Sequence, residues 1–184
     1  MAKRRKLLIV DGYNVLRSGS RYRHLRDTAP NPDYADDAFN RAREALINDT
    51  VAYAGRDYDA IIVFDGGQNA LSTGQVERIA GVRIMFSSAG TSADKVIEKL
   101  AWEARERGVE TLVVTSDATI QNTVFGGGVD RMSANGFSFA VETSEHEYEM
   151  DNSPKVAMKN TLADRIDPAT RAKLAALRDA DRRR

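Results

Sequence analysis

The sequence contains no cysteine and only two histidines, His24 and His146. Without cysteine the chain has no disulfide, no thiolate metal ligand and no cysteine nucleophile. Two histidines also make a histidine-rich zinc site unexpected. A metal site in this chain would therefore have to use oxygen ligands, which the 27 Asp and Glu residues can supply.

Long hydrophobic runs are missing as well. No apolar run approaches the roughly 20 residues that a membrane-spanning helix needs, so no membrane partner is expected. The basic residues 1–6 resemble the start of a signal peptide, but the apolar run Leu7–Val10 ends at once in Asp11 and is too short for a secretory core. We therefore expect a cytoplasmic protein.

A net charge of zero hides an uneven distribution. Residues 1–26 contain eight Lys and Arg against one Asp, and residues 155–184 contain nine against four. Residues 27–154, between them, carry ten basic and 22 acidic residues. Basic ends around an acidic centre suit a protein that contacts phosphate through its flanks, although solvated charged termini would give the same pattern.

Short apolar runs alternate with helical patterns along the chain. The runs are apolar on both faces, which is typical of a mostly parallel sheet covered by helices on both sides. The sequence therefore predicts a three-layer α/β/α domain with about five strands. Strands are predicted at Lys6–Val10, Ala60–Phe64, Val82–Phe86, Thr111–Thr115 and Val129–Met132, and helices at Asp36–Ala54, Ser92–Arg107 and in a short segment ending at Phe125.

The segment 135–148 fits two structures. Phe137, Phe139 and Val141 alternate as in a strand, but a helix capped by Ser133 fits as well and is favoured.

The domain is expected to span residues 1–152. Residues 153–184 form a basic C-terminal tail in this interpretation, with a helix near 168–181. Trp102 lies in the middle of the helix predicted over Ser92–Arg107, and we expect it in the core.

Aspartates stand at the ends of the predicted strands. Asp11, Asp65 and Asp117 each follow a strand directly or one residue later. Because parallel strands end at the same edge of a sheet, three carboxylates far apart in sequence should meet there. Asp94 joins them if the third strand leads into the helix that starts near Ser92. Each aspartate alone has an ordinary explanation as a helix cap or turn residue.

Clustered carboxylates repel one another and raise each other's pKa unless a cation neutralises them. Oxygen ligands without histidine or cysteine favour Mg²⁺ or Mn²⁺ over zinc. Such an ion can activate water for attack on a phosphodiester and steady the charge on the leaving oxygen. The sequence thus predicts a metal site formed by Asp11, Asp65, Asp94 and Asp117.

Five sequence blocks carry a family resemblance. They are Val10–Val15 (VDGYNV), Ile62–Asp65 (IVFD), Gly90–Ile97 (GTSADKVI), Val113–Asp117 (VVTSD) with Gln121, and Asp130–Ala134 (DRMSA). In this order they resemble the YacP-like branch of the NYN nucleases, which belong to the PIN-like group. The resemblance covers about residues 6–150.

The resemblance implies a PIN-like fold and a metal-dependent endonuclease that acts on RNA. Four of the matched positions are acidic in the family, and Asn14 and Ser116 match its characteristic asparagine and a polar position beside the last acid. Some members act on messenger RNA at the ribosome, which makes the ribosome a further implied partner. Lys95 stands where relatives often have a second acid, and this favours a single metal ion. The matched acids are Asp11, Asp65, Asp94 and Asp117.

Arginines and tyrosines follow the first strand. We interpret them as a flexible basic loop along which single-stranded RNA runs, with arginines on phosphates and a tyrosine stacked on a base; a mobile surface loop is the alternative. Gln121 could point at the site or at solvent, and Asn14 could orient an aspartate or a metal-bound water. The predicted RNA-binding residues are Arg17, Arg21, Tyr22, Arg23, Arg26 and Arg131.

Two functions are compatible with these features. The first is a Mg²⁺- or Mn²⁺-dependent endoribonuclease that hydrolyses phosphodiester bonds in single-stranded RNA, with Asp11, Asn14, Asp65, Asp94, Ser116 and Asp117 in its catalytic site. The second is a non-catalytic module that binds RNA or the ribosome. A haloacid-dehalogenase phosphatase is disfavoured because Tyr13 stands where its second aspartate belongs. No nucleotide cofactor is expected, because Gly126–Gly128 precede a strand rather than follow one.

Overall fold

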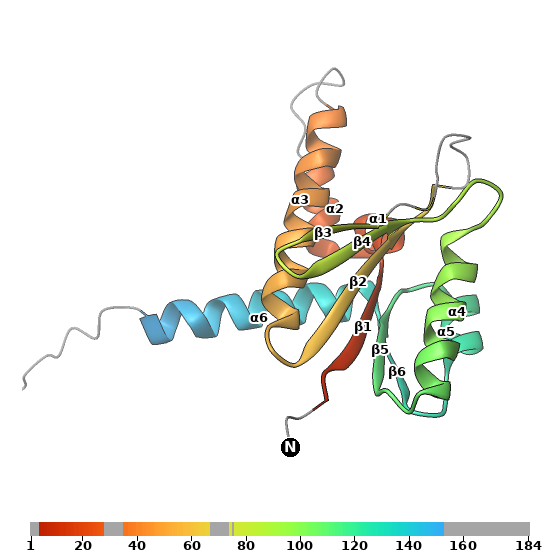
Figure 1. Ribbon diagram of the computed structural model, residues 1–184. Helices are drawn as coiled ribbons and strands as arrows, with labels where there is room; N and C mark the ends of the chain where they lie inside the picture. The colour runs from red at the N-terminus through yellow and green to blue at the C-terminus, as the bar shows by residue number, and fades with distance from the viewer. Residues whose placement is uncertain (1–3, 28–34, 67–73, 75, 153–184) are drawn as a thin grey trace, which may run out of the picture. The chain divides into compact units, whose positions relative to one another are not determined.

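The computed structural model describes residues 4–27, 35–66, 74 and 76–152 (Figure 1). The chain divides into two compact units, residues 1–148 and 149–184, and the first of them contains the sheet. The predicted helix near residues 168–181 lies outside the described residues, and the domain boundary after residue 152 stays a prediction.

A six-stranded sheet forms the centre of the domain, in the order β3-β4-β2-β1-β5-β6 (Figure 1). Every neighbouring pair is parallel except β3 and β4, so the predicted mostly parallel sheet is confirmed. The strands are β1 (Lys6–Asp11), β2 (Tyr58–Phe64), β3 (Val76–Ile79), β4 (Val82–Phe86), β5 (Thr111–Val114) and β6 (Val129–Met132).

The sixth strand, β3, was missed by the sequence analysis. All four of its residues are exposed, so it has no buried apolar run to reveal it. It pairs antiparallel with β4 through the two-residue turn Ala80-Gly81, where both residues have positive φ (47° and 90°). Tight hairpin turns of this kind require that backbone conformation.

Helices cover both faces of the sheet, which confirms the three-layer α/β/α prediction (Figure 1). Helices α1, α2, α3 and the first turns of α6 pack on one face, and α4 and α5 pack on the other. Their bounds are α1 (Gly12–Ser18), α2 (Ser20–Asp27), α3 (Ala35–Ala54), α4 (Ala93–Glu106), α5 (Ala118–Val124) and α6 (Ala134–Asn152).

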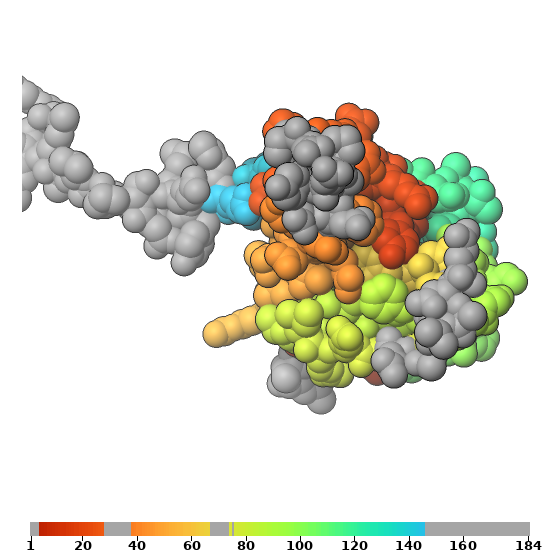
Figure 2. Space-filling view, turned by 90° about the horizontal axis from the view of Figure 1, so that it is seen from above, coloured from red at the N-terminus to blue at the C-terminus, as the bar shows by residue number. Residues whose placement is uncertain are grey.

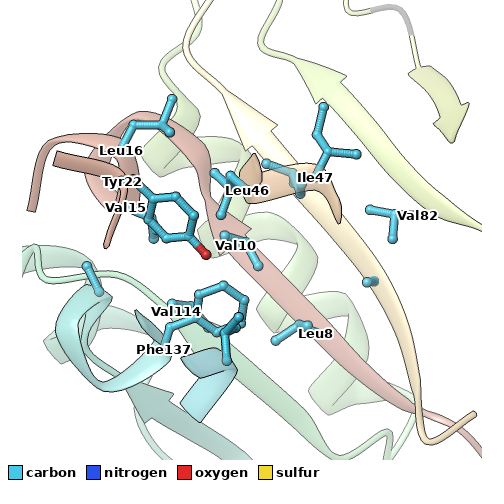
Figure 3. Packing of buried hydrophobic residues seen from close by; sticks show 14 of the residues in the cluster. Leu8, Val10, Val15, Leu16, Tyr22, Leu46, Ile47, Val82, Val114 and Phe137 are labelled. Carbon is cyan, nitrogen blue, oxygen red and sulfur yellow. The ribbon is translucent and has the colours of Figure 1, made fainter. Parts of the chain in front are cut away.

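Alternate residues of β1 supply the two cores. Leu8 and Val10 face α3, while Leu7 and Ile9 face α4, because successive side chains of a strand point to opposite faces. Figure 3 shows the first core, in which Phe137 of α6 packs near the strand residues. Burying each such side chain stabilises the fold by about 1.5–3 kcal/mol, and this fixes the sheet that carries the site.

The segment predicted as a flexible basic loop is helical instead, and this part of the prediction was wrong. Residues 12–27 form α1 and α2, separated only at Gly19. Val15, Leu16 and Tyr22 recur on the inner side of these helices and are buried against the rest of the domain. The dense arginines hid this apolar pattern in the sequence.

Two further predictions concerned helices. Residues 134–152 form α6, as favoured, with the Ser133 hydroxyl accepting a hydrogen bond from the Gly136 N–H (3.0 Å). Trp102 is 54% exposed, so its expected core position was wrong. Ala101, one residue earlier, lies on the buried face of α4, and a shift of one residue turns a side chain by about 100° around a helix.

In the described part of the chain, no helix combines the length and the apolar character needed to cross a membrane.

Candidate active site

The four predicted aspartates lie at the carboxyl edge of the parallel strands. Asp11 ends β1, Asp65 follows β2, and Asp117 follows β5 and is the N-cap of α5. Asp94 lies in the first turn of α4, which follows β4. Figure 2 looks down onto this edge, with the red segment of α1 and the green of α4 near the yellow end of β2.

Asp11 is held in place before any ligand binds. Its side chain is only 6% exposed. Oδ1 accepts a hydrogen bond from the Asn14 N–H (3.2 Å), and Oδ2 accepts one from the Thr115 hydroxyl (3.0 Å). Burial raises the pKa of Asp11 to about 6, against these two hydrogen bonds, and the charges of Asp94 and Asp117 add to the rise.

Gly12 allows α1 to start directly behind Asp11. A Cβ atom at this position would stand 2.4 Å from the ring of Phe64, the last residue of β2. Only glycine fits at this position, and this explains why glycine follows the aspartate in the Asp-Gly-Tyr-Asn block.

Asp94 responds to the same acidic surroundings. Its pKa is raised first by loss of hydration, and then by the charges of Asp117, Asp65 and Glu98. Glu98 was missed by the sequence analysis. Its position four residues after Asp94 on α4 was the available signal, because such residues are neighbours on one helix face.

Asp117 caps α5 as well as facing the other acids. Its Oδ1 accepts hydrogen bonds from the N–H groups of Thr119 (2.7 Å) and Ile120 (3.4 Å). Asp11 likewise caps α1. The ordinary explanation of these two aspartates is therefore correct, but it leaves Oδ2 of Asp117 without a hydrogen bond to any described residue.

Thr115 links the two capping aspartates. Its hydroxyl donates to Asp11 and accepts a hydrogen bond from the Asp117 N–H (3.1 Å). No sequence pattern marks this buried residue as functional, although it directly precedes Ser116 and Asp117. Gln121 donates to the Thr115 carbonyl (2.5 Å). Its side chain therefore stabilises the β5–α5 loop and does not point into the site.

Asn14 and Ser116 connect the edge to its neighbours. The Asn14 side-chain oxygen accepts a hydrogen bond from the Ser116 N–H (2.7 Å), which joins α1 to the β5–α5 loop. The Ser116 hydroxyl accepts one from the Ala134 N–H (3.0 Å) at the start of α6. Both residues thus position the loop that carries Asp117, and their catalytic roles stay predictions.

Asp65 is oriented by the end of β4. The buried hydroxyl of Ser87 donates to Asp65 Oδ1 (3.1 Å) and accepts a hydrogen bond from the Gly66 N–H (2.9 Å). Ser87 was also missed, because a single serine after a strand gives no distinctive signal.

The donor atoms fit a hard divalent cation that keeps part of its water shell. Within the described residues, no group of three or more acidic or histidine side chains has the geometry to hold a metal ion by itself. After burial, the charges of neighbouring carboxylates across the edge raise the pKa of Asp11 and of Asp94. Mg²⁺ usually contacts one or two carboxylates and keeps several waters, so such a looser arrangement of oxygen ligands suits it.

Two predicted RNA-binding residues belong to the protein's own packing. The guanidinium of Arg21 donates to Asp49 (2.8 Å) and to Glu145 (2.8 Å). Tyr22 is fully buried, and its hydroxyl donates to Asp49 (2.9 Å), so it cannot stack on a base. The pKa of Asp49 is raised by burial in spite of these partners. The prediction for Tyr22 was wrong, and Arg21 is tied to acids of α3 and α6.

The other predicted basic residues remain at the surface. Arg17 lies 5.9 Å above the Tyr13 ring, and Arg23 is exposed. Arg26 pairs with Asp27 (3.1 Å). Arg131 lies 4.4 Å above the exposed ring of Phe125 and donates to the Gln121 carbonyl (3.2 Å). Their contact with RNA stays a prediction.

A mostly parallel sheet between two helical layers, with acidic side chains at its carboxyl edge, defines a PIN-like α/β domain. The YacP-like NYN domain family matches residues 8–179, and the chain belongs to this family, which is of the nuclease type.

Relatives in Bacillus subtilis support the assignment. The chain is 30% identical over 143 residues to the uncharacterized protein YacP of strain 168, covering 78% of this chain and 79% of that protein. A crystal structure of Rae1 (YacP) superposes with a TM-score of 0.59 at 31% identity, covering 79% of this chain and 78% of that one. A crystal structure of a single-residue variant of the same protein gives 0.61 at 27% identity, covering 94% and 99%.

Proposed function

We propose that this protein is a metal-dependent endoribonuclease that hydrolyses phosphodiester bonds in single-stranded RNA. The observation that carries the proposal is the carboxyl edge of the sheet, called the acidic edge below, where the four aspartates lie. Besides burial, the charges of Asp65 and Asp117 raise the pKa of Asp94. The charges of Asp94 and Asp117 likewise add to the raised pKa of Asp11. Membership of a nuclease-type family supports it. The proposed metal-binding set is Asp11, Asp65, Asp94 and Asp117, with Mg²⁺ or Mn²⁺ as the ion.

The protein side of the mechanism is a set of fixed oxygen atoms. A bound divalent ion would supply water activation and charge stabilisation at the scissile phosphate. Thr115 and Asn14 hold the Asp11 carboxylate in one orientation, and Ser87 holds Asp65. Fixing these groups in advance avoids reorganisation during the reaction.

Substrate RNA would approach over α1 and α2. Arg17 and Arg23 lie on these helices beside the acidic edge, and their side chains are exposed. Arginine binds phosphate oxygens well because its guanidinium offers a rigid fork of donors. Messenger RNA and the ribosome stay predicted partners, drawn from the family resemblance.

A non-catalytic RNA- or ribosome-binding module is the second candidate. The observation in its favour is that the described residues contain no ready-formed set of three metal ligands. A fold kept for binding alone would not need one.

The deciding experiment is incubation of the protein with end-labelled single-stranded RNA, with Mg²⁺, with Mn²⁺ and with EDTA. We expect cleavage products only with a metal ion, and none with Asp11→Asn or Asp117→Asn. A gel shift without any metal-dependent product would favour the binding module. Cleavage by both variants at the wild-type rate would discard this site.

A further inference from the structure

Basic residues gather at the opposite edge of the sheet, where β1, β2 and β4 begin. In Figure 1 the amino end of β1 lies below, far from the edge that carries the aspartates. A cavity of about 480 Å³ lies here beside the C-terminal half of α4. Its charged lining has five basic residues against the two acids Asp59 and Glu103; the basic ones are Arg4, Arg5, Lys6, Arg83 and Arg107.

Arg83 faces another arginine across the hairpin. It is the second residue of β4, half-buried, and it pairs in register with Arg78 of β3. Like charges directly opposite each other in an antiparallel pair are unfavourable. The pKa of Arg83 is lowered by burial, then by Arg78 and by Arg107, and the nearby Asp59 only partly offsets this.

Most other charges at this edge already have partners. Arg5 pairs with Asp59 (3.2 Å), and Lys6 pairs with Glu110. Arg107 donates to the Glu103 carbonyl (3.0 Å), and Arg4 to the Arg107 carbonyl (3.4 Å), at the C-terminal end of α4.

Arg78 and Arg83 differ from these neighbours. Neither side chain forms an ion pair or a hydrogen bond with another residue of the described chain. Arg83 lines the polar cavity and Arg78 stands opposite it, while the acids of the lining, Asp59 and Glu103, form their ion pairs with other basic residues. Two guanidinium groups placed in this way are suited to bind an anion from outside.

We propose that Arg78 and Arg83, with the cavity beside them, bind the phosphodiester backbone of RNA at a site separate from the acidic edge. The described lining holds no aromatic ring on which a base could stack, so a repeating phosphate chain fits better than a nucleotide. Only the choice of RNA as the source of phosphate rests on the proposed function.

The two edges are one strand length apart. Strands of about six residues span roughly 20 Å. An RNA that reaches both edges must therefore extend well beyond the bond that is cleaved. The arginine site would help to select long or structured RNA over short fragments.

The test is a binding measurement without metal. The affinity of a fluorescently labelled single-stranded RNA is measured by anisotropy in EDTA over a series of salt concentrations, for wild type, Arg78→Gln/Arg83→Gln and Arg41→Gln. Arg41, an exposed residue of α3, is the control for loss of positive charge. We expect roughly tenfold weaker binding for the double variant, and a slope of log affinity against log salt that is smaller by about 0.7 for each phosphate that the variant no longer binds.

Stability provides a second readout. At low salt, Arg83→Gln should raise the melting temperature, because it removes a like-charge opposition. Inorganic pyrophosphate should raise the melting temperature of the wild type more than that of the double variant. A lower melting temperature for Arg83→Gln would show that the residue is structural and would overturn the proposal.

Other results would also decide the matter. Equal affinity and salt slope for wild type and the double variant would reject the site. Pyrophosphate binding that depends on Arg83, together with unchanged RNA affinity, would reject RNA as the ligand. If Arg41→Gln weakened RNA binding equally, the loss of affinity would come from the lower net positive charge alone, and the site would be rejected as well. Because binding is measured without metal, failure of the cleavage assay leaves this result interpretable.

Discussion

The two edges of one parallel sheet carry opposite charges. At the carboxyl edge, burial and the charges of neighbouring aspartates raise the pKa of Asp11 and Asp94, while at the amino edge burial, Arg78 and Arg107 lower the pKa of Arg83. Both arrangements cost free energy until a counter-ion arrives. The sheet keeps them apart because all its strands except β3 point the same way.

The edges differ in how firmly their side chains are held. Asp11 and Asp65 receive hydrogen bonds from Thr115 and Ser87, which orient them. Arg78 and Arg83 have no such bonds within the described residues. Fixed oxygens suit chemistry at one atom, whereas unfixed guanidinium groups suit binding along a chain of phosphates.

The largest expected effect is on cleavage at the acidic edge. Asp117→Asn keeps an oxygen that can cap α5 but removes the charge, so the fold should survive. Initial rates with labelled RNA and Mg²⁺ should fall by about a hundredfold or more. Arg41→Gln serves as the control with an unaltered edge. If the Asp117→Asn protein remained active, the carboxyl edge would not be the catalytic one, and the functional difference between the two edges would be lost.

Arg21 tests what a fully paired charge contributes. Arg21→Ala leaves the buried Asp49 without its cation, and removing one partner of a buried pair typically costs about 3 kcal/mol or more. Denaturant unfolding should show this decrease in stability, whereas Arg17→Ala should change stability little. A stable Arg21→Ala protein with weaker RNA binding would instead assign Arg21 to the RNA surface.

The pH dependence of stability should reveal Asp11. Its pKa of about 6 in the folded state lies above the ordinary aspartate value of 3.8, so the folded state binds the proton more tightly. Protonated Asp11 therefore stabilises the folded state fully below pH 3.8, and this contribution is lost as the pH rises through about 6. The whole contribution amounts to about 3 kcal/mol.

Comparison with Asp11→Asn isolates this contribution. In EDTA, the stability of the wild type relative to the variant should fall between about pH 4 and pH 7. If the difference in stability between the wild type and the variant stays constant across this pH range, the pKa of Asp11 is not shifted.

A smaller effect is expected from metal binding to the folded state. Mg²⁺ or Mn²⁺ should raise the melting temperature, by an amount equivalent to about 2.7 kcal/mol at a hundred times the dissociation constant. Asp94→Asn should weaken the response, while Arg83→Gln should leave it unchanged. If the melting curve stayed the same across titrations with Mg²⁺ and with Mn²⁺, no metal ion would bind at the acidic edge.

The carboxyl edge was accessible to sequence analysis because its signals are local. A strand buried on both faces is a continuous apolar run, and the aspartate that ends it is the next polar residue, as at Val10-Asp11 and Phe64-Asp65. Parallel direction then places the ends together. Thr115 and Ser87 could not be assigned in this way, because their roles depend on which residue lies opposite in space.

The amino edge was not accessible. Strand β3 is exposed throughout, so no burial pattern marked it, and without it Arg78 has no reason to face Arg83. Tyr22 failed for the same kind of reason. Its partner Asp49 is 27 residues away on α3, and only the packing of α2 on α3 brings the two together.

The sequence by itself determined the layered α/β fold, the parallel direction of the five strands that it predicted and the edge that receives the acidic residues. These follow from hydrophobic periodicity and chain direction, which are written into neighbouring residues. The tertiary structure alone decided which charges are neutralised by partners and which are left without them. That depends on contacts between distant segments, and the free energy of a charge is set by its surroundings rather than by its neighbours in the chain.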